Sequence, residues 1–180
     1  MNNRLVRRAL TVAAVCAAQA CALPANALSS SRALATFEGH TIDLSLGWGD
    51  AHACMVDDMG VTCFRSEQAM DQVQVAINAR TQLASVAPAV ALSLCSTALR
   101  LYDGTSFSGS VLSITSRGAL VSLSGLGFDN VTSSYKVGAC GAHLYSGIQT
   151  GLYPGNTAAN AQATSMLSGW DNTISSVLIP

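Results

Sequence analysis

The stretch Asp171-Asn172-Thr173-Ile174-Ser175-Ser176 lies close to the C-terminus of this 180-residue chain, and its pattern occurs twice. The first copy, 42 positions earlier, is Asp129-Asn130-Val131-Thr132-Ser133-Ser134, and each copy follows a glycine and an aromatic residue. A repeat of this period indicates two copies of one supersecondary unit. The acidic, amide and hydroxyl side chains supply many oxygen atoms, which suit a hard cation, Ca²⁺ above all.

The sequence around the two hexapeptides has the texture of β structure. From residue 90 onward, short runs of alternating apolar and polar residues are separated by turn residues. The runs are 99–102, 110–115, 119–123, 133–137, 142–145, 162–166 and 174–179. Strands this short and frequent predict a β-sandwich or a barrel.

One of the turns between these runs points to a family. The segment Tyr102-Asp103-Gly104-Thr105-Ser106-Phe107-Ser108-Gly109 has two aromatic residues four positions apart, followed by one residue and a glycine. It resembles the folded hairpin of the βγ-crystallin Greek key. That family also carries (Asp/Asn)-(Asp/Asn)-x-x-(Ser/Thr)-Ser late in each Greek key as its Ca²⁺-binding motif, and both hexapeptides match it. The resemblance implies that residues 95–180 form an all-β, βγ-crystallin-type sandwich of two Greek keys.

The second key departs from this hairpin pattern. Gly151 follows Gly109 by the repeat offset of 42, but at that offset Tyr102 corresponds to Leu144 and Phe107 to Gln149. The aromatic pair is then missing, unless Tyr145 takes the first position through a one-residue deletion. The fold signature therefore comprises Tyr102, Phe107, Gly109 and Gly151.

The resemblance also implies how Ca²⁺ would be held, with each site shared between the two keys. From each hexapeptide it uses the carbonyl of the third residue (Val131, Thr173) and the side chain of the fifth (Ser133, Ser175). The loop and its charge or amide oxygens come from Asp129, Asn130, Asp171 and Asn172. With one carboxylate per loop, we expect a dissociation constant of about 10⁻⁵ to 10⁻³ M. The site centred on residues 171–176 would borrow backbone from the regular first hairpin, which makes it the stronger candidate.

The N-terminal residues predict export. Residues 1–27 combine a basic start, an apolar Ala-rich run and the cleavage pattern Ala25-Asn26-Ala27, which is typical of a secretory signal peptide and too short for a membrane span. The cleaved chain would keep six basic and ten acidic residues, a net charge of −4 with neutral His. No basic patch is available, so nucleic acid and anionic membranes are not expected as partners.

Residues 28–94 predict a small N-terminal segment. Residues 28–36 are rich in Ser and Ala and read as frayed, and 41–44 could form a short strand. Residues 51–56 and 61–65 flank the turn 57–60, which predicts a β-hairpin. Ser66 is a plausible N-cap for a helix whose apolar stripe is Met70, Val73 and Ile77. Residues 80–89 read as a linker.

Four cysteines remain after cleavage: Cys54, Cys63, Cys95 and Cys140. An even number in an exported chain indicates disulfides, with three possible pairings. Because Cys54 and Cys63 lie on opposite sides of the predicted hairpin turn, their pairing is the natural one. It would leave Cys95 and Cys140, each just before the first strand of a repeat, to tie the repeats together.

A second resemblance supplies an alternative function. Exported actinobacterial-type proteins with a Gly-Trp-Gly-Asp segment, a Cys hairpin and a crystallin-like half are similar to Gly47-Trp48-Gly49-Asp50 and the residues that follow. Such chains are grouped with secreted metalloproteinase inhibitors, which would make an extracellular protease the partner. Loops 57–62 and 146–155 are the candidate inhibitory loops. An enzyme is not expected, because neither G-x-S-x-G nor H-E-x-x-H is present.

Overall fold

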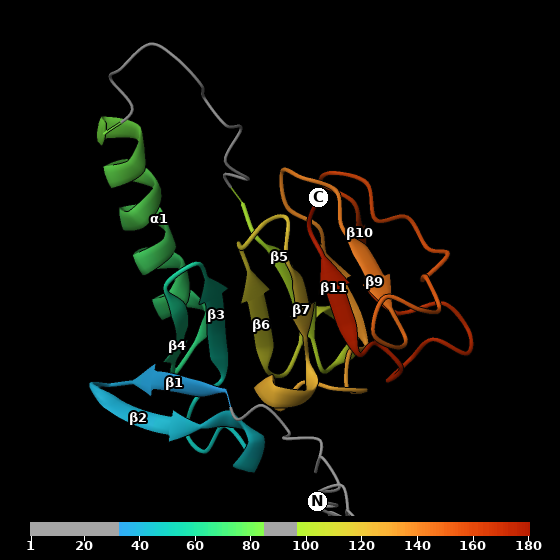
Figure 1. The fold of residues 1–180 in the computed structure, drawn as a ribbon, viewed down its shortest axis with the longest axis horizontal. Helices are drawn as coiled ribbons and strands as arrows, with labels where there is room; N and C mark the ends of the chain where they lie inside the picture. Colours follow the sequence, from blue (N-terminus) through green and yellow to red (C-terminus); the bar gives the residue numbers. More distant parts are fainter. Residues whose placement is uncertain (1–32, 85–96) are drawn as a thin grey trace, which may run out of the picture.

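The computed structural model describes residues 33–84 and 97–180. The predicted signal peptide, Cys95 and residues 85–89 of the predicted linker lie outside the described residues. Figure 1 shows the described chain as a β-rich body with a helix along one side.

Strands form two sheets, with the order β10-β8-β5-β6-β3-β4-β1-β2 in the larger and β7-β11-β9 in the smaller. The larger sheet contains β1 (Leu34–Phe37), β2 (His40–Asp43), β3 (Ala53–Asp57), β4 (Gly60–Phe64), β5 (Leu99–Tyr102), β6 (Val111–Ile114), β8 (Ser134–Lys136) and β10 (Gln162–Ala163). The smaller sheet contains β7 (Leu120–Ser122), β9 (His143–Tyr145) and β11 (Ser176–Leu178). The helical segments of the described chain are α1 (Glu67–Ala84), η1 (Leu44–Leu46), η2 (Thr105–Phe107) and η3 (Ser124–Leu126). Each of the seven runs predicted from residue 99 onward contains one of these strands.

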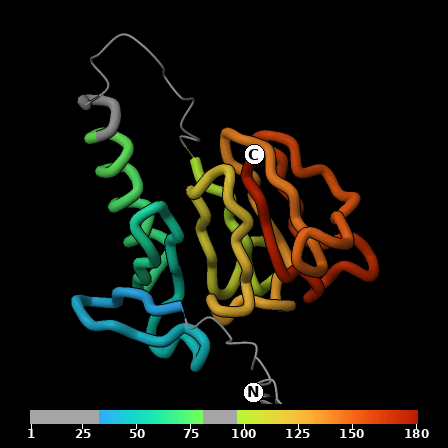
Figure 2. The backbone as a smooth tube through the Cα atoms, viewed as in Figure 1, coloured from blue at the N-terminus to red at the C-terminus, as the bar shows by residue number. Residues whose placement is uncertain are grey.

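Two Greek keys make up the part of the chain after residue 97. The first key consists of β5, β6, β7 and β8; the second consists of β9, the segment around Leu152 that bridges to Tyr145, β10 and β11. Strand β7 of the first key pairs with β11 of the second, and β10 of the second pairs with β8 of the first. Figure 2 shows the keys side by side, the first in yellow and the second in orange to red. The predicted all-β sandwich of two Greek keys is confirmed.

The interior of the sandwich is apolar and closed to solvent. Leu101, Leu112, Leu144, Ile174 and Val177 come from both keys and are 0% exposed. Burial of each such side chain contributes roughly 1.5–3 kcal/mol. The alternation of β5 directs Leu99 and Leu101 into this core and turns the residues between and after them to the opposite face.

The N-terminal strands extend the sheet of the first key. Strand β3 pairs in parallel with β6, and β1 pairs in parallel with β4. The predicted hairpin is present as β3 and β4, with Cys54 opposite Cys63 and a disulfide between them. Cys140 is also disulfide-bonded, while the predicted pairing with Cys95 falls on a residue outside the described chain.

Strand β1 was not expected from the sequence, because residues 28–36 read as frayed. In the structure Ala35 and Phe37 point into the core while Leu34 and Thr36 face solvent. Only two inward residues carry the alternation, and one of them is a small Ala. The strand is therefore stabilised mainly by its pairing with β2 and β4, which a local pattern does not reveal.

Helix α1 begins as predicted, with the Ser66 hydroxyl accepting a hydrogen bond of 3.2 Å from the Ala69 backbone N–H. It packs on the outer face of the larger sheet, where Met70 is buried and Ile77 is half-buried. The predicted stripe was wrong in one member, since Val73 is 38% exposed. The helix also continues to Ala84, so the predicted linker does not start at residue 80. Within residues 33–84 and 97–180, no helix combines the length and the apolar character that crossing a membrane requires.

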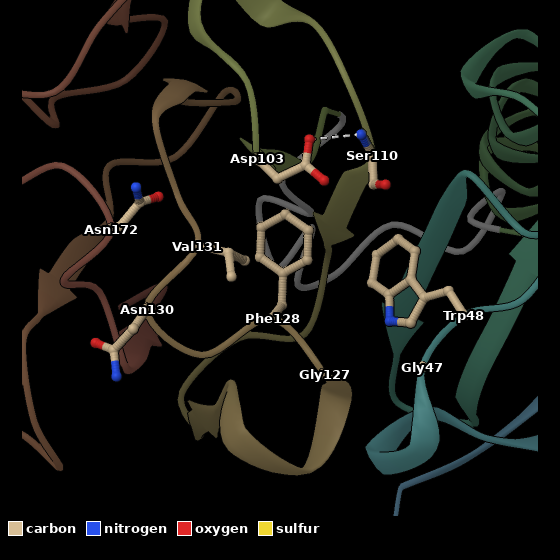
Figure 3. Close-up of a pocket in the computed structure, with 9 residues that line it drawn as sticks. All are labelled: Gly47, Trp48, Asp103, Ser110, Gly127, Phe128, Asn130, Val131 and Asn172. Atoms are coloured by element: carbon tan, nitrogen blue, oxygen red, sulfur yellow. Dashed lines mark hydrogen bonds between the residues drawn. The ribbon is translucent and has the colours of Figure 1, made fainter.

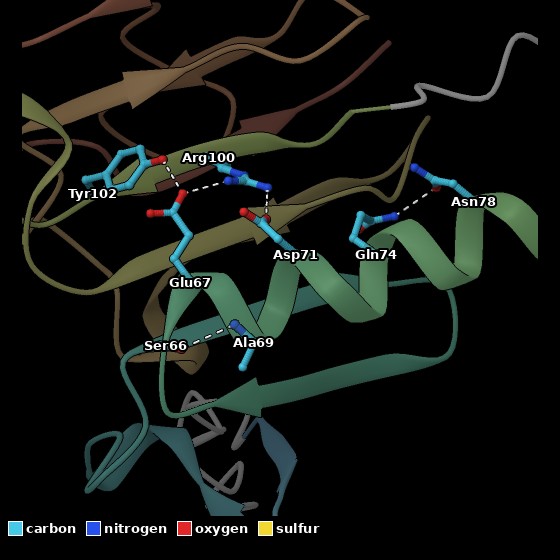
Figure 4. Close-up of polar contacts among 8 residues, drawn as sticks. All are labelled: Ser66, Glu67, Ala69, Asp71, Gln74, Asn78, Arg100 and Tyr102. Carbon is cyan, nitrogen blue, oxygen red and sulfur yellow. Dashed lines mark hydrogen bonds and ion pairs between the residues drawn. The ribbon is translucent and has the colours of Figure 1, made fainter.

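Polar contacts join helix α1 to strand β5 of the larger sheet (Figure 4). The Glu67 carboxylate accepts hydrogen bonds from the Arg100 guanidinium at 2.6 Å and from the Tyr102 hydroxyl at 2.7 Å. Arg100 also pairs with Asp71 one helical turn further on. Burial, with the hydrogen bond to Glu67 as the second cause, raises the pKa of Tyr102 above its ordinary value. The neutral phenol is thus part of the folded state.

Candidate metal-binding site

The two hexapeptides lie against each other and are joined reciprocally. The Asn130 backbone N–H donates to the Ile174 carbonyl at 2.9 Å, and the Asn172 N–H donates to the Thr132 carbonyl at 3.0 Å. The second residue of each copy therefore contacts the fourth residue of the other. The structure brings the two predicted metal loops together at the junction of the two keys.

The second position of each hexapeptide has an unusual backbone. Asn130 and Asn172 both have φ of 56°, in the left-handed region that Asn tolerates better than most residues. The turn carries each exposed side chain to the opposite key. The choice of Asn at both positions thus has a backbone reason as well as a chemical one.

Side chains cross between the copies in the same reciprocal manner. The Ser133 hydroxyl donates to Oδ1 of Asn172, and the Ser175 hydroxyl donates to Oδ1 of Asn130, each at 3.3 Å. Because Ca²⁺ lies about 2.4 Å from each ligand oxygen, two oxygens at this separation can bind the same ion. Each pair takes one oxygen from each key.

Two further oxygen groups of the loops are available. The carbonyls of Val131 and Thr173, the predicted backbone ligands, accept no hydrogen bond from any described residue. Asp129 is half-buried, and its Oδ1 is enclosed without a hydrogen-bond partner. An enclosed carboxylate oxygen without a partner is costly and calls for one. The donor set of these loops therefore fits a hard cation.

The loops are poor in charge. Asp171, the acidic residue of the second copy, is exposed. Among the described residues no three His, Cys, Asp or Glu side chains gather in a group that could hold a metal. Any cation here would be held chiefly by hydroxyl, amide and carbonyl oxygens, which suits Ca²⁺ and disfavours zinc.

The sixth residue of each hexapeptide does something the sequence did not suggest. The Ser134 hydroxyl donates to the Gly104 carbonyl at 2.6 Å and accepts from the Phe107 N–H at 3.1 Å, which ties strand β8 to the first hairpin. Ser176 does the same in the second key, with the Gly147 carbonyl at 2.6 Å and the Gln149 N–H at 3.4 Å. Both serines are 0% exposed. The sequence signal that could have pointed to this role is the presence of a serine at the sixth position of both hexapeptides.

The two hairpins can now be aligned by their contacts. The Tyr102 carbonyl accepts a hydrogen bond of 2.8 Å from the backbone N–H of Ser133, and the Tyr145 carbonyl accepts one of 2.8 Å from the backbone N–H of Ser175. The two tyrosines therefore occupy equivalent positions. The second hairpin is therefore one residue shorter than the first. Tyr145 takes the position of Tyr102 through this one-residue deletion. Tyr102 and Phe107 pack edge to face at 5.6 Å, whereas Gln149 replaces the second aromatic residue.

The two signature glycines occupy corresponding places in the hairpins. Gly109 has φ of +80° and Gly151 has φ of +67°. A Cβ on Gly109 would lie 1.8 Å from Oδ1 of Asp103, and one on Gly151 would lie 2.1 Å from Oγ of Ser146. The positive φ favours glycine at both positions, and a Cβ there would also displace the Asp103 or Ser146 side chain.

A cavity of about 530 Å³ opens beside the hexapeptides (Figure 3). Asn130, Val131 and Asn172 form one wall, and Asp103 and Trp48 come from the first hairpin and from the N-terminal segment. The sequence singled out the Trp48 segment without giving it a role. Its place beside the predicted metal loops arises from tertiary packing.

The comparisons with known proteins concern the crystallin-like half. No protein-family model matches the chain, and no curated protein matches it. A βγ-crystallin from Ciona intestinalis is 19% identical, over 46% of this chain and 99% of that chain, with a TM-score of 0.39. A double mutant of a βγ-crystallin domain from Clostridium beijerinckii is 21% identical, over 46% and 96%, with a TM-score of 0.33. A clostrillin double mutant in complex with nickel is 16% identical, over 46% and 97%, with a TM-score of 0.38.

These three solved structures are βγ-crystallin proteins or domains, or a clostrillin, and each matches 46% of this chain. The C-terminal half folds as a sandwich of two Greek keys that is similar to the βγ-crystallin domains, and the N-terminal strands extend one of its sheets. The metalloproteinase-inhibitor resemblance finds no counterpart among the matched structures.

Proposed function

We propose that this protein is an exported Ca²⁺-binding module whose fold is stabilised by the ion. The observation that carries the proposal is the crossed pairing of Ser133 with Asn172 and of Ser175 with Asn130. Each pair offers two hard oxygens at a spacing that one Ca²⁺ ion can span, with the carbonyls of Val131 and Thr173 available beside them. In this role the ion supplies charge and coordination, and the loops supply its ligands.

Binding at these sites would join the two keys. The ligands of each site come from the loop before β8 and from the loop before β11, which are 42 residues apart in the chain. An ion that binds only the folded arrangement stabilises it by RT ln(1 + [Ca²⁺]/Kd), about 2.7 kcal/mol per site when the ion is at 100 times Kd. The site centred on residues 171–176, which would use Ser175 and the Thr173 carbonyl, remains our stronger candidate of the two, because it would borrow backbone from the regular first hairpin.

A thermal melt in excess Ca²⁺ and in EGTA tests the proposal. We expect a higher Tm in Ca²⁺, and loss of most of that increase when Ser133→Ala is combined with Ser175→Ala. The matched control is Ser122→Ala with Ser124→Ala, because among the described residues the hydroxyls of these two serines hydrogen-bond only to each other. An unchanged Tm in the unsubstituted protein would reject the proposal.

Export is a part of the same proposal. The Cys54–Cys63 disulfide is typical of proteins that fold in an oxidising compartment. Ca²⁺ concentrations outside the cell also suit sites of modest affinity. Mass determination of protein recovered from culture medium would test cleavage after Ala27.

Protease inhibition is the second candidate, and one observation favours it. Met59 is 89% exposed at the tip of the β3–β4 hairpin. The disulfide closes this hairpin, and the Asp57 carboxylate accepts hydrogen bonds from the Met59 and Gly60 N–H groups at 2.8 and 3.1 Å. A rigid turn that presents one apolar side chain is the form an inhibitory loop needs. Titration of a thermolysin-like protease, with Met59→Ala as the variant, tests this candidate, and absence of inhibition would exclude that target.

A further inference from the structure

The cavity beside the metal loops has the lining of a ligand site. Its walls come from four separate parts of the chain: the loop at Trp48, the first hairpin at Asp103, and the two hexapeptides (Figure 3). It is an open depression of about 530 Å³, a volume within the range of small-molecule sites. We propose that this cavity binds a neutral saccharide, an activity distinct from Ca²⁺ binding.

Trp48 provides an aromatic wall that is held in place before any ligand arrives. Its Nε1–H donates to the Leu126 carbonyl at 2.7 Å, and its ring stacks on Phe128 at 5.3 Å. Phe128 is buried, but Trp48 is only half-buried, so part of the indole stays open to the cavity. The apolar C–H face of a pyranose ring packs on such a surface. A ring fixed in advance loses little entropy on binding.

Two polar residues of the lining have hydrogen-bonding capacity that no described residue uses. The Asp103 carboxylate receives one hydrogen bond from a described residue, from the Ser110 N–H to Oδ1 at 2.7 Å, which leaves Oδ2 unpaired. The amide nitrogen of Asn130 has no partner among the described residues, because only its Oδ1 is engaged. One acceptor and one donor beside an aromatic ring are complementary to the hydroxyls around a sugar.

The charges of the lining exclude other classes of ligand. No Lys, Arg or His lines the cavity, and Asp103 is its one ionisable group, so phosphates and other anions are disfavoured. A wholly apolar ligand would use neither the free oxygen of the Asp103 carboxylate nor the amide nitrogen of Asn130. An organic cation would contact the indole and the carboxylate but would accept no hydrogen bond from the Asn130 amide. A neutral polyhydroxylated ligand uses all of these groups.

The two tryptophans of the chain make the test direct. Trp170 does not line the cavity and packs edge to face on Tyr153. The ¹⁵N-labelled protein should therefore show two indole N–H signals, one at the cavity and one as an internal control, assigned with Trp48→Phe and Trp170→Phe. Methyl glycosides of glucose, galactose, mannose and N-acetylglucosamine, and disaccharides of these sugars, are titrated in Ca²⁺ and in EGTA. We expect at least one to shift the Trp48 signal saturably in both buffers while the Trp170 signal stays fixed.

A matched pair of variants links the shift to the cavity. Asp103→Asn keeps the acceptor for the Ser110 N–H and replaces the unpaired oxygen with an NH₂ group, and we expect saccharide affinity to fall at least tenfold. Asp58→Asn removes the same charge on an exposed turn outside the cavity and should leave the affinity unchanged. Both variants are first checked for an unchanged Tm.

Three outcomes would overturn the inference: no sugar shifts the Trp48 signal in either buffer, choline shifts it while the sugars do not, or Asp103→Asn binds as well as the unsubstituted protein. Saccharide binding in EGTA does not depend on the ion, so it distinguishes a failure here from a failure of the Ca²⁺ proposal.

Discussion

The last two serines of each hexapeptide are neighbours in the chain, yet the structure gives them different roles, which predicts opposite responses to substitution. Ser134→Ala removes both hydrogen bonds of a hydroxyl that is 0% exposed, those to the Gly104 carbonyl and from the Phe107 N–H. Each group left without its partner costs about 1 kcal/mol or more. We therefore expect a loss of about 2–4 kcal/mol in the free energy of unfolding. Ser176→Ala should cost less, because its second hydrogen bond is long, at 3.4 Å.

The preceding serines provide the contrast. Ser133 and Ser175 each donate one hydrogen bond of 3.3 Å, and the acceptors are exposed amides that water can satisfy. Their replacement by Ala should cost less than about 1 kcal/mol in EGTA. In Ca²⁺ the ranking of the losses in the free energy of unfolding changes. Ser133→Ala and Ser175→Ala lose the stabilisation that the ion gives, whereas Ser134→Ala keeps it.

Urea denaturation of the four single variants, in EGTA and in Ca²⁺, measures both effects. Equal m-values across the set would show that the denatured states are comparable. If Ser134→Ala proves as stable as Ser133→Ala in EGTA, the two hydrogen bonds of Ser134 do not stabilise the hairpin as we infer.

Other expectations follow from the same structure. Gly118→Ala, at positive φ with open space around it, should cost about 1 kcal/mol. Gly109→Ala should cost more, because its Cβ would also displace the Asp103 carboxylate that accepts a hydrogen bond from the Ser110 N–H. Urea midpoints compare them, and equal losses would contradict the steric argument. Burial, with a hydrogen bond to Glu67, raises the pKa of Tyr102, so above about pH 10 the unfolded chain releases this proton while the folded chain keeps it, and stability should fall as pH rises. Tyr102→Phe should make that fall shallower, and an unchanged slope would exclude this cause. Replacing Cys54 and Cys63 together by Ala should lower the free energy of unfolding by roughly 2–3 kcal/mol, because the disulfide no longer closes the loop in the unfolded chain. A variant as stable as the unsubstituted protein would show that the disulfide does not stabilise the fold.

The fold of the crystallin-like half could be predicted because its information is local and repeated. Each strand there has its own alternating run, and the hexapeptides mark equivalent points of the two keys. The N-terminal segment was harder. Strand β1 has only Ala35 and Phe37 facing inward, and the face of α1 is set by Glu67 and Asp71 meeting Arg100, a residue 29 or more positions away. Apolar periodicity does not report such polar partners.

The candidate site could be predicted in its residues but not in its arrangement. The hexapeptides identified Asn130, Asn172 and both fifth-position serines, while the crossed pairing depends on how two loops 42 residues apart meet. The cavity depends on longer-range packing still, since Trp48 reaches the Leu126 carbonyl 78 residues away. No residue spacing in the sequence predicts the contact between Trp48 and Leu126.

Calorimetric titration of the mature protein with Ca²⁺ tests the central claim most directly. We predict saturable binding with a dissociation constant of about 10⁻⁵ to 10⁻³ M at one or two sites, and loss of that binding in the variant that combines Ser133→Ala with Ser175→Ala. Absence of any binding heat across this range, together with a Tm that Ca²⁺ leaves unchanged, would contradict the account. Undiminished binding by the double variant would place the ion elsewhere.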